Sequence, residues 1–337
     1  MLHLPFDKIC RMKTYKSRIF DAILQDALEA KGAVLIQGPK WCGKTTTAEQ
    51  IAQSVLYMSD PGKIEQNLLA AETNPCMLLK GDSPRLIDEW QSAPKLWDAI
   101  RFDIDHSDQL GKFILTGSAV PADKNKIQHT GTGRFAWLTM RPMSLFESKE
   151  SSGSVSLENI FSGNNLKLGE SFNHTLESIA FLSCRGGWPQ AIDMNRKAAL
   201  RQAFDYVDAI ANNDISRVDK ILRDPSIARR LLKSLARLQG TQSSVRTILS
   251  DISIHQAKDI HENTIYAYIG ALKKIFVVED MEAWCPNLRC KTPIRTTDTR
   301  YFSDPSIATA ALGLGPDELI EDLAGNFLHI VSPNKLL

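Results

Sequence analysis

Short apolar runs alternate with segments of helical periodicity along residues 31–146. Because buried strands are short and apolar, we expect one in each of five stretches: residues 33–37, 55–58, 85–90, 111–119 and 135–140. Between two of them, Leu96, Ile100 and Ile104 recur every four residues and give a helix one apolar face. Strands that alternate with helices favour a mostly parallel sheet covered on both faces. The pattern predicts an α/β fold.

The pattern changes in the second half of the chain. Residues 147–171 are rich in Ser, Gly and Asn, which indicates a flexible boundary or an inserted loop. A helical pattern resumes at residue 174 and breaks at Gly186 and Gly187. From Ala199 onward, apolar side chains recur at spacings of three and four, which predicts a helical domain.

A winged helix-turn-helix is expected near the end of this helical region. Residues 245–253 and 262–274 predict two helices with a break between them, followed by apolar and aromatic residues sufficient for two strands. The exposed positions around the second helix are mildly basic and include one acid: His261, Glu262, Asn263, Lys273 and Lys274. Such a unit either reads double-stranded DNA or packs against protein, and both roles stay open.

Composition adds little about partners. The chain has 337 residues, of which 43% are hydrophobic and 23% charged, with a formal net charge of +1. This charge gives no overall signature of polyanion binding. The N-terminal residues lack the apolar stretch of a signal peptide, and no segment approaches the roughly 18 apolar residues of a membrane span. We therefore expect a cytoplasmic protein with no membrane contact.

Residues 38–45, GPKWCGKT, satisfy the phosphate-loop pattern G-x-x-x-x-G-K-[ST]. Its glycines let backbone N–H groups face phosphate oxygens, Lys44 reaches the terminal phosphates, and the hydroxyl of Thr45 binds magnesium. The following helix adds its positive N-terminus. The expected nucleotide-binding residues are Gly38, Pro39, Lys40, Trp41, Cys42, Gly43, Lys44, Thr45 and Thr46. The side chains of Trp41 and Cys42 are expected to pack.

Hydrolysis requires an acidic pair near the loop, and residues 85–90, RLIDEW, supply one. Asp88 would hold magnesium and Glu89 would polarise the attacking water. The alternative is a strand end with two surface carboxylates. Thr116 and Ser118 follow the next apolar strand and could orient water or the terminal phosphate. Ligands bind at the carboxyl ends of parallel strands, where these residues would gather.

At this point the sequence resembles a known family, the predicted AAA-type ATPases widespread in bacteria and archaea. The resemblance covers roughly residues 15–325 and rests on six ordered blocks: GAVLIQGPKWCGKTTTA, RLIDEWQ, FILTGSA, GRFAWLTMRPMSLFE, CRGGWPQA and YFSDPSIA. It implies a core sheet of strand order 5-1-4-3-2, with an added strand between the two nucleotide motifs.

The resemblance also implies roles for single residues. Lys44 and Thr45 would belong to the Walker A motif and Asp88 and Glu89 to the Walker B motif, while Thr116 or Ser118 would act as the sensor. Arg134 would be an arginine finger that reaches the nucleotide of a neighbouring subunit in a homo-oligomer. The alternative for Arg134 is a surface arginine at the start of an edge strand.

The resemblance, together with the changes of pattern, divides the chain. The expected parts are a basic lead-in with a docking helix at 1–30, an ATPase core at 31–146, a flexible insertion with lid-like helices at 147–198, a winged-helix region at 199–290, and the truncated start of a nuclease-like domain at 291–337. Asp304 would belong to the beginning of this last domain.

The sequence therefore predicts a Mg²⁺-dependent ATPase that splits ATP into ADP and phosphate and drives or switches the winged-helix region. One alternative is a non-hydrolysing DNA-binding regulator gated by nucleotide. A P-loop kinase is disfavoured, because Glu89 beside Asp88 fits water activation better than binding of a phosphate acceptor. A protein partner stays open beside DNA.

Overall fold

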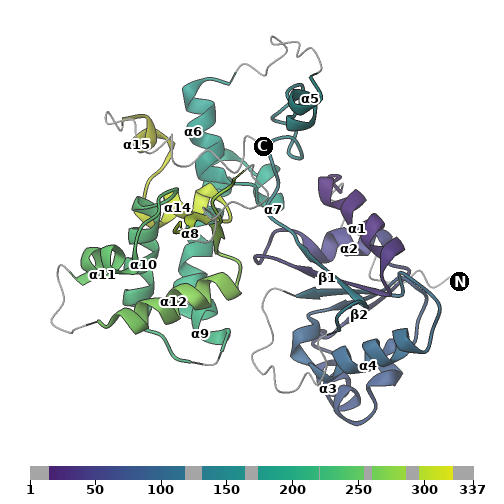
Figure 1. Cartoon of the computed structure of the whole chain (residues 1–337). Helices are drawn as coiled ribbons and strands as arrows, with labels where there is room; N and C mark the ends of the chain where they lie inside the picture. Colours follow the sequence, from purple (N-terminus) through teal and green to yellow (C-terminus); the bar gives the residue numbers. More distant parts are fainter. Residues whose placement is uncertain are drawn as a thin grey trace, which may run out of the picture.

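The computed structural model describes residues 15–117, 131–163, 174–219, 221–253, 260–285 and 296–321. The sensor candidate Ser118 and most of the basic lead-in lie outside the described residues. The described residues form two bodies, a sheet flanked by helices and a mainly helical body that begins at α6 (Figure 1).

The first body is a parallel sheet of five strands in the order β2-β3-β4-β1-β5. Its strands are β1 (Ala33–Gln37), β2 (Ser54–Tyr57), β3 (Arg85–Asp88), β4 (Phe113–Gly117) and β5 (Phe135–Thr139). Each neighbouring pair is parallel. The predicted strand order is confirmed, with β4 inserted between the strands that carry the two nucleotide motifs.

Helices cover both faces of this sheet, as predicted. Helices α1 (Ile19–Ala30) and α2 (Lys44–Ile51) lie on one face, and α3 (Ile64–Thr73) and α4 (Lys95–Asp105) on the other (Figure 1). The side chains of strand β1 alternate between the two faces of the sheet. Val34 and Ile36 face the core under α1 and α2, whereas Ala33 and Leu35 face the core under α3 and α4.

Two charged residues that lie outside the expected ATPase core at 31–146 are buried. Arg18, in the basic lead-in, and Glu147, at the start of the expected flexible boundary, are both buried. Arg18 Nε donates to Glu147 Oε1 at 3.0 Å, and Glu147 also accepts from the backbone N–H groups of Ile19 and Ser144. The sequence did not predict this ion pair, because two residues 129 positions apart leave no local signal of their contact.

Short helices follow this segment: α5 (Leu157–Phe161), α6 (Leu176–Arg185) and α7 (Pro189–Ile192). Helix α6 ends at Gly186, where the backbone takes a φ of 76° that favours glycine. The predicted break at Gly186 and Gly187 is thus confirmed. Gly187 passes so close to Met143 that an added Cβ would lie 2.1 Å from the Met143 carbonyl oxygen.

The helical body contains α8 (Arg196–Ala209), a π-helical turn (Ile210–Asp214), α9 (Ile215–Arg217), α10 (Pro225–Arg237), α11 (Val245–Ser253) and α12 (Glu262–Lys274). The predicted helices at 245–253 and 262–274 are confirmed. Strands β6 (Val278–Met281) and β7 (Thr299–Phe302) then pair antiparallel. An isolated bridge joins Thr241, between α10 and α11, to Arg300 of β7.

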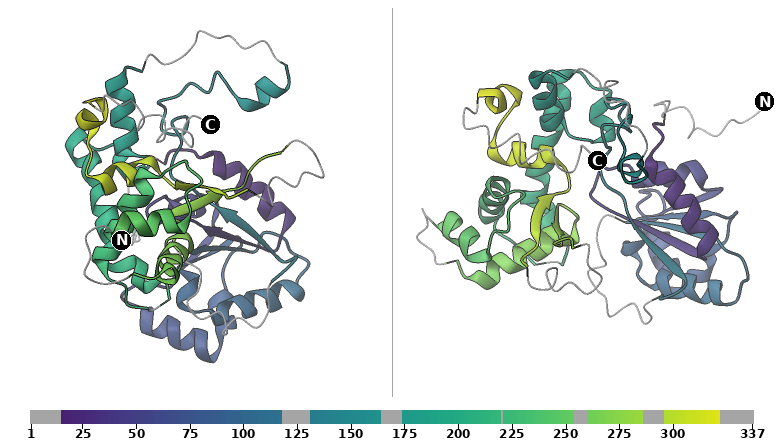
Figure 2. Two further views of the ribbon diagram at one scale, coloured as in Figure 1. Left: turned by 60° about the vertical axis from the view of Figure 1, so that its left-hand side comes forward. Right: turned by 45° about the horizontal axis from the view of Figure 1, so that its top comes forward.

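Residues on both sides of the boundary expected at residue 290 share one core. Phe302 of β7 and Ile307 of α14 (Pro305–Leu312) belong to the same core as α8, α10 and α12, and α14 lies among α6, α8 and α10 (Figure 2). Asp304 is buried as the N-cap of α14 and also accepts from the backbone N–H of Gly187 at 2.8 Å. These residues complete the helical body, followed by α15 (Pro316–Glu321).

Replacing Arg18 with Met should lower the free energy of unfolding by about 3–5 kcal/mol, because it leaves the Glu147 carboxylate buried without its partner. Chemical denaturation followed by circular dichroism measures the loss. The matched control is Arg201→Ala, which breaks the exposed pair with Asp205 and should leave the free energy of unfolding almost unchanged, because solvent screens exposed ion pairs. Equal effects of the two substitutions would contradict the role assigned to the buried pair.

Candidate nucleotide-binding site

The loop between β1 and α2 is shaped by its first glycine. Gly38 follows Gln37 directly and has a φ of 149°. A Cβ at this position would lie 2.1 Å from the carbonyl oxygen of Met140, which follows the neighbouring strand β5. The close approach of two backbones therefore requires glycine here, and it folds the loop back over the carboxyl edge of the sheet.

Lys44 is buried at the start of α2. Its Nζ donates to the carbonyl oxygens of Gly38 at 2.9 Å and Pro39 at 2.7 Å. Two neutral carbonyl oxygens of the same loop thus hold the ammonium. Because it forms no ion pair with any residue that the structure describes, its positive charge is available to an anion that enters the loop.

Asp88 collects two hydroxyl donors at the end of β3. Its Oδ1 accepts from Thr45 Oγ1 at 2.7 Å and from Thr116 Oγ1 at 2.6 Å. Thr45 comes from α2, whereas Thr116 is the register partner of Asp88 on β4. All three predicted residues therefore meet at one carboxyl edge, although they come from three separate elements.

Glu89 leaves the strand in a left-handed conformation with φ 56°. Such a conformation costs a non-glycine residue roughly 1–2 kcal/mol. Here it turns the chain away from the direction of β3. Burial raises the pKa of Glu89, and the charge of Asp88 raises it further, while Lys44 partly offsets both. Gln91, which the sequence analysis did not single out, donates to Glu89 Oε2.

The remaining loop residues divide between packing and contact with the helical body. Cys42 is fully buried, as expected, and burial raises the pKa of its thiol. Thr46 is exposed on α2. The side chains of Lys40 and Trp41 face residues of the helical body, Asp214 and Tyr206 respectively. Asp214 belongs to no sequence motif, so the sequence did not indicate its contact with Lys40.

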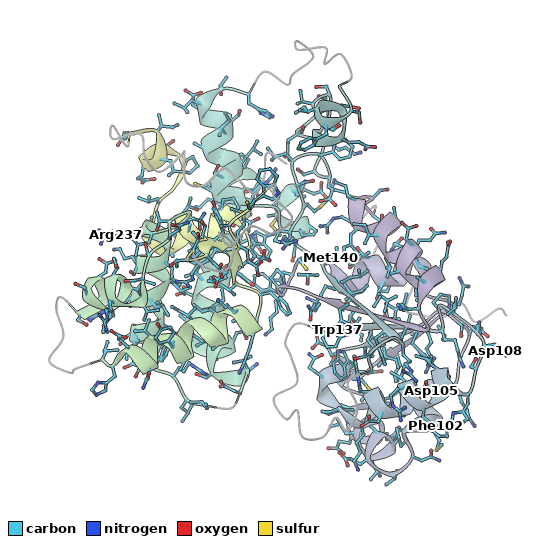
Figure 3. All side chains as sticks on the ribbon, in the orientation of Figure 1. Phe102, Asp105, Asp108, Trp137, Met140 and Arg237 are labelled. Carbon is cyan, nitrogen blue, oxygen red and sulfur yellow. The ribbon has the colours of Figure 1, made fainter. Side chains whose placement is uncertain are left out.

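Arg134 lies at the opposite edge of the sheet from the loop. Its carbonyl accepts from Ala33 at the start of β1, and its Nε donates to Asp105 at 2.8 Å. In Figure 3, Asp105 lies far from Met140, which marks the loop side. A strand of five residues spans roughly 16 Å, so Arg134 does not reach the phosphate loop of its own chain.

The chain matches two family models. Residues 30–149 match an AAA domain, and residues 176–318 match a domain of unknown function (DUF8612). The second match crosses residue 290 without interruption, in agreement with the continuous core of the helical body. The fold, the site and the family model together define residues 30–149 as an AAA-type P-loop domain.

Similar proteins leave the activity of the whole chain undefined. Uncharacterized proteins of Mycobacterium bovis and Mycobacterium tuberculosis are each 22% identical over 300 residues, which cover 87% of this chain and 59% of theirs. The chain thus spans little more than half the length of these relatives. A Walker-type ATPase of Pyrococcus abyssi has a similar fold, with a TM-score of 0.52, 13% identity, and coverage of 89% of this chain and 97% of that one.

Within the described residues, no helix combines the length and apolar character that crossing a bilayer requires.

Glu89→Gln should raise the melting temperature at pH 7, because burial and the charge of Asp88 disfavour the ionised carboxylate of Glu89 in the native protein. A pKa raised on folding favours the folded state below the unfolded value, near 4.3 for Glu, and this benefit is lost as pH rises through the folded value. The gain from glutamine should therefore shrink as pH falls from 7 to 4. Thermal melts across this range test it, with Glu29→Gln on the exposed face of α1 as control. A gain that does not depend on pH would refute the assigned cause.

Proposed function

We propose that the protein is a Mg²⁺-dependent ATPase that binds ATP on residues 38–46, hydrolyses it to ADP and phosphate, and couples this cycle to its helical body. The observation that carries the proposal is the meeting of Thr45 and Thr116 on one oxygen of Asp88, beside the buried ammonium of Lys44. A strand end with two surface carboxylates would not bury Asp88 under two hydroxyls.

The residues present fit a magnesium nucleotide. Mg²⁺ prefers hard oxygen ligands and is usually bound by one or two protein groups together with phosphates. The Thr45 hydroxyl and the Asp88 carboxylate supply such oxygens at a mutual distance of 2.7 Å. Lys44 and the N-terminus of α2 add positive charge on the phosphate side. When bound, the metal ion would neutralise charge on the phosphate oxygens.

Glu89 is the proposed general base. A raised pKa makes the Glu89 carboxylate a stronger base, which suits a group that accepts a proton from water. Gln91 holds one carboxylate oxygen and so fixes the direction in which the other can point. Thr116, on the opposite side of Asp88, is the sensor candidate among the described residues.

Lys44→Ala should abolish most ATP affinity, because the loop loses its one buried ammonium beside the phosphates. Glu89→Gln should keep the affinity and lower phosphate release by roughly 10²–10⁴-fold, the usual contribution of a general base. Calorimetry measures the binding, and steady-state phosphate release measures the turnover.

Lys31→Ala is the control for charge, since Lys31 Nζ reaches the Gly133 carbonyl at the far edge of the sheet. Both properties should survive that change. Unchanged ATP binding by the Lys44 variant would rule out the phosphate-loop assignment. Binding without release by the native protein would favour a nucleotide-gated switch over an ATPase.

Homo-oligomerisation and the finger role of Arg134 stay part of the proposal. Because Arg134 lies at the edge away from its own loop, it could contribute only to the site of a neighbouring copy. Arginine fingers supplied in trans stabilise charge on the transferring phosphate.

DNA binding is the second candidate function, favoured by the order of elements in the helical body. Helix α10, the Thr241 bridge, helices α11 and α12 and the β6–β7 pair follow one another as in a winged helix. In this interpretation α12 enters the major groove. Its exposed side chains include Asn263, Tyr266 and Lys274, which can contact bases and phosphates.

If α12 contacts duplex DNA, affinity should fall steeply as salt increases, because each phosphate contact releases counterions. Lys274→Ala should weaken binding for all sequences and reduce the slope of log affinity against log salt by about one. Fluorescence anisotropy with a labelled duplex provides the measurement. Lys63→Ala, exposed beside α3, should leave the slope unchanged, and no measurable binding at low salt would exclude this candidate.

A further inference from the structure

The outer side of the phosphate loop docks on the helical body. Lys40 Nζ donates to Asp214 Oδ1 at 2.7 Å, and the Trp41 ring lies 5.5 Å from the ring of Tyr206. Tyr206 in turn packs against Trp188, with 4.5 Å between ring centroids. Two consecutive loop residues are therefore held from outside, by elements that follow them by more than 160 residues.

The backbone at Trp41 indicates why the loop needs this support. Trp41 has a φ of 66°, in the left-handed region that glycine adopts readily and a bulky residue does not. Such a conformation is strained for a bulky residue, whereas an aromatic pair at this separation is favourable. The contact with Tyr206 thus offsets part of the strain.

Asp214 is placed by an irregular helix. It ends the π-helical turn Ile210–Asp214, a rare structure that occurs frequently at functional sites. The Asp214 side chain is 11% exposed, whereas that of Lys40 is 42% exposed. A nearly buried carboxylate thus holds an ammonium that water could otherwise solvate. Asp214 is thus the less exposed member of the pair and lies on the helical body.

We propose that Asp214 and Tyr206 are positioning residues for the phosphate loop, so that nucleotide affinity depends on the helical body of the same chain. The inference rests on the proposed nucleotide binding and adds a regulatory contact to it. Linkage makes the effect reciprocal: if docking raises ATP affinity, bound ATP must stabilise docking by the same factor. The contact then carries the state of the nucleotide site to α8.

A contact that only holds the two bodies together would give different experimental results. It would alter stability when broken, but it would leave the affinity of folded protein for ATP unchanged, and nucleotide would not affect α8. The distinguishing readouts are therefore the ATP dissociation constant and the nucleotide-dependent hydrogen exchange of residues 206–214.

The first test compares Asp214→Asn with Asp205→Asn, which removes an exposed carboxylate from α8, the helix that leads into the π-helical turn. Asp214→Asn should raise the ATP dissociation constant by about 5- to 150-fold, the usual range of coupling between sites. A non-hydrolysable ATP analogue should slow exchange of residues 206–214 in the native protein and the Asp205 variant, and not in the Asp214 variant.

The second variant, Trp41→Gly, relieves the backbone strain while removing the ring. If docking positions the loop, its ATP affinity falls despite the easier backbone. If the loop adopts its conformation without the helical body, ATP affinity stays the same or rises, which overturns the inference. This variant changes an exposed side chain, so it keeps the test decisive even where Asp214→Asn fails to fold.

The outcomes separate the two proposals. If the native protein binds no ATP, the proposed function fails and the docking contact has nothing to regulate. If the native protein binds ATP and Lys44→Ala does not, while both docking variants retain native affinity and nucleotide-dependent exchange, the proposed function stands and the positioning role is refuted.

Discussion

The parallel register around β1 is the constraint on which the site depends. β1 pairs with β4 on one side and with β5 on the other, over the same five residues. β4 pairs with β3 on its other side. Parallel strands in register end at one edge, so Gly38, Asp88 and Thr116 emerge together there. No single hydrogen bond brings the phosphate loop to the acidic pair. The backbone hydrogen bonds between the strands bring them together, and the Thr45 and Thr116 hydroxyls then fix the Asp88 carboxylate.

A second network links this edge to the helical body. Arg18 donates to the Cys42 carbonyl in the loop at 2.9 Å and to the Arg141 carbonyl at 2.8 Å, while its Nε binds Glu147. Two residues after Arg141, the N–H of Met143 donates to the Gly187 carbonyl at 2.7 Å. The buried Asp304 accepts from the N–H of Gly187 and caps α14. The loop thus has a continuous path of backbone and charged groups to the core of the helical body.

These contacts join blocks that lie far apart in the sequence. The segment around Gly187 must carry glycine where it crosses Met143, and Trp188 donates from its ring N–H to Ser306 at 2.9 Å. The segment around Asp304 supplies the acceptors for both. In this arrangement Asp304 holds the segment around Gly187 against the N-terminus of α14.

The sequence by itself determined the local features: the strands, the loop with its glycine and lysine, the helix at 262–274 and the break at Gly186. Apolar periodicity and backbone preference are short-range properties, and neighbouring residues carry them. Only the tertiary structure decided that Arg18 and Glu147 are buried, that Gln91 holds Glu89, that Arg134 lies away from its own loop, and that Asp214 meets Lys40. Each of these depends on side chains that the fold brings together from distant positions, and an isolated charge in a sequence does not indicate which partner it will find.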